Sequence, residues 1–196
     1  MAGHIEDGTG TGNKMKVDAQ KKAHVQSLSI NYEDFAVLNG DSFGVLAPVT
    51  TLTSGTISYL LYVSNDNTHD IVISNLLLST GESTGGANKD WLLTIQFNPT
   101  GGTLISAGSA VFEVNNNLSS AKTLDITPLS GVEGSTATGG VAVSQLVNGE
   151  STFRLGQKIV VPAGASFALG VTPPTSNTSV DTNIGLTLIK QTIDFN

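Results

Sequence analysis

Two segments alternate apolar and polar side chains with the two-residue period of a half-buried β-strand. In residues 91–97, Leu93, Ile95 and Phe97 fall on one face, while Thr94 and Gln96 fall on the other. In residues 166–172 the same pattern places three apolar side chains on one face: Phe167, Leu169 and Val171. Both segments are predicted to be strands with one face in the core and the other face in water.

Two further segments, residues 57–63 and 71–78, are apolar on both faces. They are predicted to be interior strands, covered on one side by a facing sheet and on the other side by something else, for which a neighbouring subunit is one candidate. The Asn- and Asp-rich link between them, residues 64–70, is typical of a hairpin turn.

The last apolar segment, residues 183–195, changes its register along its length. Ile184, Leu186 and Leu188 share one face, and three later residues share the opposite face: Ile189, Gln191 and Ile193. A β-bulge near Leu188 is the expected cause, since one extra residue reverses the alternation.

Segments rich in Gly, Pro and Asn separate the apolar ones, which gives about eight to ten strands. The fold class predicted is therefore all-β, with a single antiparallel β-sandwich of jelly-roll type in residues 23–196. Residues 1–22 contain several glycines and four lysines but few apolar residues, so they are expected to form an extended N-terminal arm.

Composition narrows the classes of partner. The formal charge is −7 and Arg154 is the one arginine, so a nucleic-acid ligand is not expected. The absence of Cys excludes disulfides and thiolate metal sites and is compatible with a reducing cytoplasm. No apolar run approaches the length of a membrane helix, and the first residues lack the apolar core of a secretory signal, so no membrane partner is expected.

Short motifs for catalysis occur without the context that they need. Residues 81–85 (GESTG) match the nucleophile elbow of serine hydrolases, but a Gly-rich stretch follows where that motif requires a helix. Residues 8–12 (GTGTG) resemble a phosphate-binding loop with no strand before them and no helix after them. Both segments are interpreted as loops, and no catalytic residue is predicted.

Oxygen-bearing side chains raise two more possibilities. Residues 65–70 offer ligands for Ca²⁺ but lack the Gly and Glu positions of an EF-hand loop, so an Asx-capped turn is preferred. Glu33 with Asp34, or Glu133 with Glu150, would have to face each other across a cleft to hydrolyse a glycoside. We interpret them as solubilising surface charges, and we expect no metal and no cofactor.

Several segments, in one order along the chain, resemble a group of small virion structural proteins of tailed bacteriophages. The matching segments are 12–18 (GNKMKVD), 24–27 (HVQS), 59–66 (YLLYVSND), 70–73 (DIVI), 160–164 (VVPAG) and 173–179 (PPTSNTS). The resemblance implies a jelly-roll-like decoration or cement protein on the surface of the phage head, assembled in the host cytoplasm. It further implies a homotrimer, the major capsid protein as partner, and no catalytic residues.

The hypothesis that follows is that residues 1–30 contact the shell while the sandwich packs against its copies. The expected arm contacts are Lys14, Lys16, Val17, His24 and Val25. The sandwich contacts, chosen for their surplus of apolar character, are Tyr59, Tyr62, Leu77 and Trp91.

Two alternatives from other classes remain open. A receptor- or carbohydrate-binding module of a phage fibre, tail or adhesin predicts exposed aromatic or polar loops around a concave site. A depolymerising enzyme predicts facing carboxylates in a groove.

Overall fold

The computed structural model describes residues 31–53, 55–81, 90–148, 153–154, 158–174 and 179–191. The chain divides into two units, Met1–Asn31 and Tyr32–Asn196, and every element described below belongs to the second. The predicted arm, and its boundary after residue 22, lie outside the described residues.

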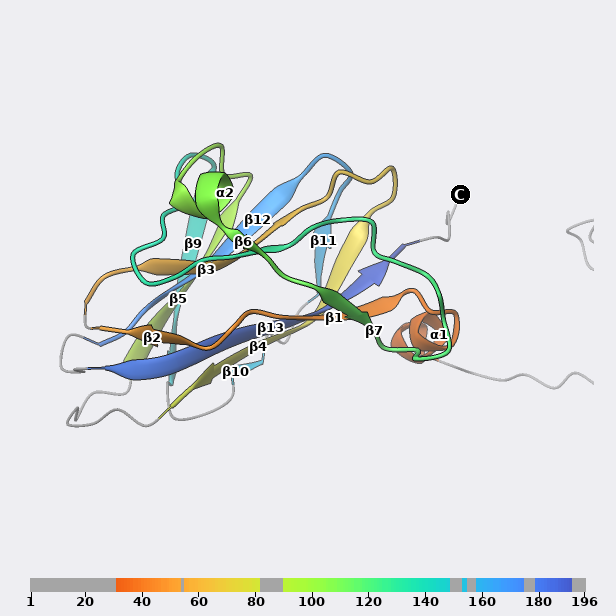
Figure 1. The fold of residues 1–196 in the computed structure, drawn as a ribbon, viewed down its shortest axis with the longest axis horizontal. Coiled ribbons are helices and arrows are strands. Elements are labelled where there is room, and N and C mark those ends of the chain that lie inside the picture. The colour runs from red at the N-terminus through yellow and green to blue at the C-terminus, as the bar shows by residue number, and fades with distance from the viewer. Residues whose placement is uncertain are drawn as a thin grey trace, which may run out of the picture. The chain divides into compact units, whose positions relative to one another are not determined.

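The described part of the second unit is a sandwich of two sheets (Figure 1). The six-stranded sheet contains, in spatial order, β6 (Ser109–Ala110), β8 (Leu129–Ser130), β3 (Ser58–Ser64), β12 (Ser166–Thr172), β5 (Asp90–Phe97) and β9 (Val141–Asn148). The seven-stranded sheet contains β10 (Phe153–Arg154), β4 (Ile71–Thr80), β13 (Val180–Lys190), β1 (Ser42–Leu46) and β7 (Glu113–Asn115), with β11 (Ile159–Val161) on β4 and β2 (Thr50–Leu52) on β13. Two short helices are present in the described residues: α1 (Tyr32–Leu38) and α2 (Thr103–Ala107).

The strand order confirms the predicted fold class. β2 continues β1 along β13, and β11 continues β10 along β4. Counting each of these pairs as one strand, and leaving aside the short strands β6, β7 and β8, eight main strands remain. Numbered along the chain, one sheet has the order first, eighth, third, sixth, and the other has second, seventh, fourth, fifth. The described pairings between these strands are antiparallel. This is the strand order of a jelly roll, the double Greek key that closes one sandwich.

The core lies between the two sheets, where the predicted inward-facing side chains are found. Leu93, Phe167, Leu169 and Val171 are all buried in it. From the seven-stranded sheet they meet a second set of buried side chains, which includes Phe43, Ile73, Leu76, Ile184 and Leu188. The alternating pattern therefore identified the core face of both half-buried strands correctly.

One long connection, residues 98–140, which we call the cover segment, closes one side of the sandwich. Its strand β8 pairs with β3 and extends the six-stranded sheet, while its strand β7 pairs with β1 and extends the seven-stranded sheet. Between these strands it contributes Val111, Leu124 and Ile126 to the core. The segment thus protects one edge of each sheet, the edges that β3 and β1 would otherwise present.

Two Thr-Gly-Gly triplets hold the ends of the cover segment together. The backbone N–H groups of Thr100 and Gly101 both donate to the carbonyl of Thr138, and the N–H of Thr138 donates back to Gly101. Gly102 and Gly140 have φ values of 115° and 70°. A Cβ at Gly140 would lie 2.0 Å from a backbone oxygen, so only glycine fits this closure. The recurring triplet forms loops, as expected, and its two described copies are joined to each other by backbone hydrogen bonds.

The prediction that both half-buried strands have one face in water is wrong for the six-stranded sheet. Thr94, Gln96 and Ala168, on its outer face, are buried. Leu104 of helix α2 and Ala137 pack with Tyr59 and Ala168 in a second apolar cluster, and the Gln96 amide donates to the carbonyl of Gly139 in the cover segment. The cover that β3 requires on its second face is therefore supplied by the same chain.

Helix α1 supplies the corresponding cover at one end of the seven-stranded sheet. Ala36 packs on Val72 and Ile189, which point away from the main core. The register of β13 against β4 shifts between Thr187 and Leu188, where the sequence predicted a bulge, but the extra residue is Ser74 on β4. The extra residue reverses the alternation of β4, so that Ile71 and Ile73 face the core before it and Leu76 and Leu78 after it. The alternation of β13 itself is regular: Leu188 faces the core and Ile189 lies under the helix.

The link between β3 and β4 is not a hairpin, because these strands belong to different sheets. Asn65 is fully buried, and its amide donates to the carbonyls of His69 (2.9 Å) and Val161 (2.8 Å). Its side-chain oxygen accepts from the N–H of Asn67 at 3.2 Å, which is the Asx turn expected from the sequence. The buried Asn65 amide therefore holds the segment in which the chain passes from the six-stranded to the seven-stranded sheet.

Candidate interaction surface

The outer face of the seven-stranded sheet carries an apolar surface that the described residues leave open. In register across β4, β13, β1 and β7, one row contains Asn75, Thr187, Gly44 and Val114. The next row contains Leu77, Gly185 and Leu46. We call these seven residues the open face.

A glycine lies at the centre of the second row. Leu46 and Leu77 flank Gly185, and a Cβ added there would lie 3.2 Å from Leu46 Cδ1 and 3.7 Å from Leu77 Cβ. The two leucines therefore border a depression whose floor is backbone. Leu46 remains 57% exposed, although it lies on a central strand of the sheet.

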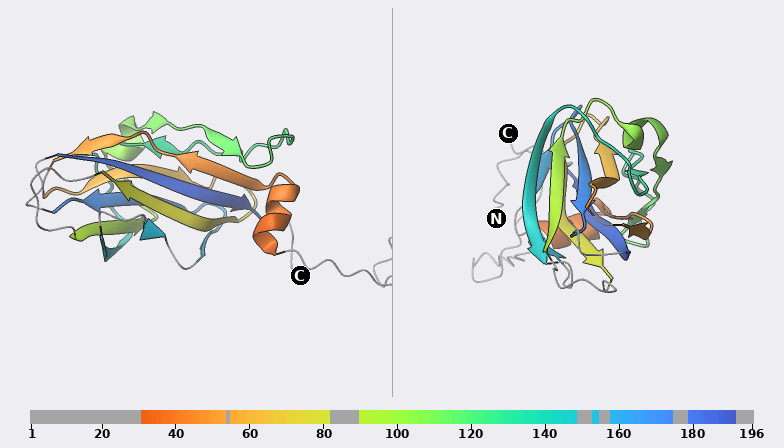
Figure 2. Two further views of the ribbon diagram at one scale, coloured as in Figure 1. Left: turned by 90° about the horizontal axis from the view of Figure 1, so that it is seen from below. Right: turned by 90° about the vertical axis from the view of Figure 1, so that its left-hand side faces the viewer.

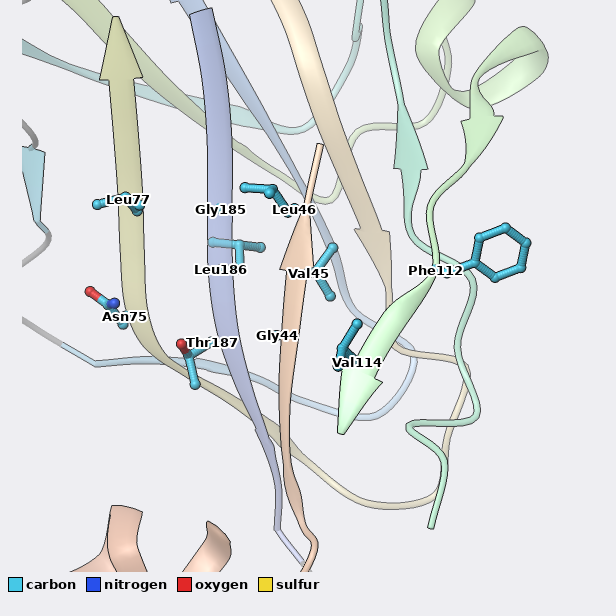
Figure 3. Close-up of a pocket in the computed structure, with 10 residues that line it drawn as sticks. All are labelled: Gly44, Val45, Leu46, Asn75, Leu77, Phe112, Val114, Gly185, Leu186 and Thr187. Carbon is cyan, nitrogen blue, oxygen red and sulfur yellow. The ribbon is translucent and has the colours of Figure 1, made fainter. Parts of the chain in front are cut away.

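This depression is a shallow groove of about 300 Å³ (Figure 3). Val114 forms one side and is 59% exposed, and Phe112 lies at the rim with 86% of its side chain exposed. In Figure 3 the Phe112 ring points away from the strands that carry Leu77 and Gly185. Contiguous exposed apolar side chains of this kind mark contact surfaces in soluble proteins.

A polar depression of about 420 Å³ adjoins the groove and shares Asn75 and Thr187 with it. Glu33 and Asp34 of helix α1 border its far side. Glu33 is paired with Lys158 at 3.0 Å, and the Lys158 ammonium lies 5.6 Å from the centre of the Tyr32 ring. The open face is thus bordered at one end by a depression that carries two acidic residues.

The structure separates the four sandwich residues that were expected at an interface. Leu77 is half-buried on the open face, whereas Trp91 is buried in the main core. Tyr59 is buried beneath the cover segment on the opposite sheet, and Tyr62 packs against the same cluster. For Trp91 and Tyr59 the surplus apolar character is accounted for within the chain, so these two residues offer a partner almost no surface. Lys14, Lys16, Val17, His24 and Val25 lie outside the described residues.

Sequence reasoning missed Leu46, Phe112 and Val114. Leu46 is two residues from the Ala-Pro interruption of its strand, which obscures the alternation. Phe112 and Val114 do alternate within a turn-rich segment, and this was the available signal. The signal was weak because β7 has only three residues.

Glu133, one of the carboxylates considered for glycoside hydrolysis, makes hydrogen bonds that favour its charged form. Glu133 accepts from the N–H of Thr53 at 2.6 Å and also from the Thr53 hydroxyl. These hydrogen bonds, the hydroxyl first, lower the pKa of Glu133, whereas a general acid for glycoside hydrolysis needs a raised pKa. Glu150 and most of the residue 81–85 motif lie outside the described residues.

Other chemistry can be tested only within the described ranges. There, no three His, Cys, Asp or Glu side chains gather in a group that suits a metal ion. Among the same residues no helix has the length and apolar character to cross a membrane. Burial raises the pKa of the Tyr59 hydroxyl, which donates to Gln96 beneath the cover segment.

Comparison with known proteins adds no relative. No protein-family model matches the chain, and no curated protein matches it significantly. The resemblance to phage virion proteins therefore rests on the sequence segments given above.

Proposed function

We propose that this chain is a non-catalytic structural protein of a tailed-phage particle, a decoration or cement protein that contacts the major capsid protein and its own copies on the head surface. The open face carries this proposal. Its apolar side chains lie outside the core of the sandwich, and because they stay exposed they contribute little buried area to folding. Jelly rolls are also a fold that viral capsid domains use.

A double substitution tests whether the open face makes the contact. Leu46→Asp with Val114→Asp places two charges in the groove at positions that are already more than half exposed, so folding is retained. Co-sedimentation with tailed-phage capsids is expected to fall about tenfold or more, because burying an apolar side chain contributes about 1.5–3 kcal/mol and 1.4 kcal/mol is tenfold in affinity. Val132→Asp, on an exposed position of the cover segment, is the matched control.

A second variant separates the sandwich from the arm. Removing residues 1–22 is expected to reduce capsid occupancy if the arm contributes shell contacts, since several weak contacts act together on a repeated lattice. Undiminished occupancy of this variant would contradict the arm hypothesis. A wild-type protein that never sediments with any capsid would contradict the proposed function as a whole.

Phe112 favours one second candidate, a carbohydrate-binding module of a fibre, tail or adhesin. Its exposed ring lies at the rim of a groove that also contains Asn75 and Thr187. An exposed aromatic ring beside a groove is a feature on which a sugar ring can stack. Glycan-array binding that disappears in Phe112→Ala would support this function over capsid binding.

A further inference from the structure

The six-stranded sheet ends at strand β9, and no described residue pairs with the outer edge of that strand. β9 pairs with β5 along all eight of its residues, from Asp90–Asn148 to Phe97–Val141, without a register shift. It is therefore a long, regular edge with a row of backbone groups available on its free side. Figure 2 (right) shows it in teal on the side of the sandwich away from the green cover segment.

The side chains of β9 lack the features that usually protect an edge. Residues 141–148 (VAVSQLVN) contain no charge and no proline. Val141, Val143 and Leu146 are each more than half exposed. A long, regular and uncharged edge strand with exposed apolar side chains is a template for pairing with another strand.

The other described edges differ from β9. β6 and β10 have two residues each, and β2 and β7 have three each. β11 also has three, and it lies between Lys158 and Pro162. Short strands, lysines and prolines all discourage pairing between chains. The absence of such features is specific to β9 among the described edge strands.

A second copy of the same chain suits this edge. The chain carries a net charge of −7, so a contact between two copies is least opposed where it brings no further like charges together, and the uncharged strand β9 is such a surface. A two-fold axis normal to the sheet makes the two strands antiparallel and brings residues of the same face together. With the axis at Ser144, Val141 of one copy lies opposite Val147 of the other, and Ala142 opposite Leu146.

We propose that β9 is a dimerisation edge, at which two copies pair antiparallel about Ser144 and join their six-stranded sheets into one continuous sheet. The contact covers the exposed valines on the inner face and Leu146 on the outer face. It does not depend on the proposed function, and it joins copies in pairs. The trimer implied by the phage resemblance would need a different surface.

A charge on the edge tests the proposal. The wild-type protein is expected to shift from monomer to dimer with rising concentration in sedimentation velocity, and Val143→Lys is expected to stay monomeric at every concentration. Val160→Lys is a matched control, because Val160 on β11 is 52% exposed against 56% for Val143. A wild-type monomer throughout, or a Val143→Lys variant with the wild-type mass, would overturn the proposal.

A cross-link tests the register even if the lysine variant fails to fold. Directly opposed residues in an antiparallel pair have Cβ atoms about 4.5–5.5 Å apart, which is close to the separation that a disulfide spans. The chain has no cysteine of its own, so Ser144→Cys is expected to form a covalent dimer on mild oxidation. Ser119→Cys, exposed on the cover segment, is expected to remain uncross-linked, and equal cross-linking of both variants would contradict pairing at β9.

Discussion

The outer faces of the two sheets differ in how far other described parts of the chain cover them. On the six-stranded sheet, helix α2 and the residues around it bury Tyr59, Gln96 and Ala168. On the seven-stranded sheet, helix α1 covers Val72 and Ile189 at one end, but Leu46 and Val114 stay more than half exposed. Each sheet has apolar side chains on its outside, and only one sheet has its cover within the described residues.

A glycine on a central strand of each sheet shows the same contrast at the level of single atoms. On the covered face, the ring of Tyr59 occupies the space above Gly170, where a Cβ would lie 2.9 Å from the Tyr59 ring atom Cδ1. On the open face, Leu46 and Leu77 border Gly185 without closing over it. An aromatic residue from a neighbouring strand thus fills one site, and the other site remains a groove.

Removing a leucine from each face gives the largest expected difference. Leu104→Ala deletes a fully buried side chain from the cover, and a loss of about 2–5 kcal/mol in the free energy of unfolding is expected. Leu46→Ala on the open face is expected to change it by less than about 0.5 kcal/mol. Urea denaturation of both variants measures the contrast, and a loss for Leu104→Ala as small as that expected for Leu46→Ala would show that the cover segment does not stabilise the sandwich.

Adding a methyl group at each glycine gives a smaller difference. Gly170→Ala is expected to cost about 1–3 kcal/mol, because the Tyr59 ring is buried and tied to Gln96 and so cannot move aside. Gly185→Ala meets the mobile end of Leu46, so thermal stability is expected to stay near that of the wild type. A destabilised Gly185→Ala variant would indicate that the groove is as tightly packed as the covered face.

The sequence was sufficient for the fold class and for the core, because the period of two identifies inward-facing residues such as Leu93 and Leu169 without tertiary information. It also located the register shift at Leu188. It did not show that Gln96 and Ala168 are buried, since their cover comes from a turn-rich segment with little periodicity. Only the long-range pairing of β8 with β3 brings that segment onto the sheet.

The same limit explains the interface residues. Surplus apolar character in a strand indicates a second cover but does not say whether the cover is the same chain or a partner. For Tyr59 it is the same chain. Leu46, Leu77 and Val114 come from strands distant in sequence, and they share a face only through pairings of β13 and β1 with their neighbours.

The smallest expected effect concerns two carboxylates of the cover segment, Glu133 and Asp125, which accept hydrogen bonds from the rest of the sandwich. Thr53 donates to Glu133, and Lys190 donates to Asp125 at 2.7 Å, so both carboxyl pKa values are lowered in the folded protein. A lowered folded-state pKa contributes stability that is fully present above the unfolded-state pKa and is lost as the pH falls through the folded-state value.

Glu133→Gln and Asp125→Asn should therefore lower the melting temperature slightly at neutral pH and leave it unchanged in strong acid, where the wild-type carboxyls are also protonated. Asp125 has a φ of 58°, a conformation that Asn tolerates, so its substitution tests the charge and not the backbone. Melting curves between neutral pH and acid measure the difference. A difference that persists below the folded-state pKa of both groups would mean that hydrogen-bond geometry, and not charge, fastens the cover segment to the sheets.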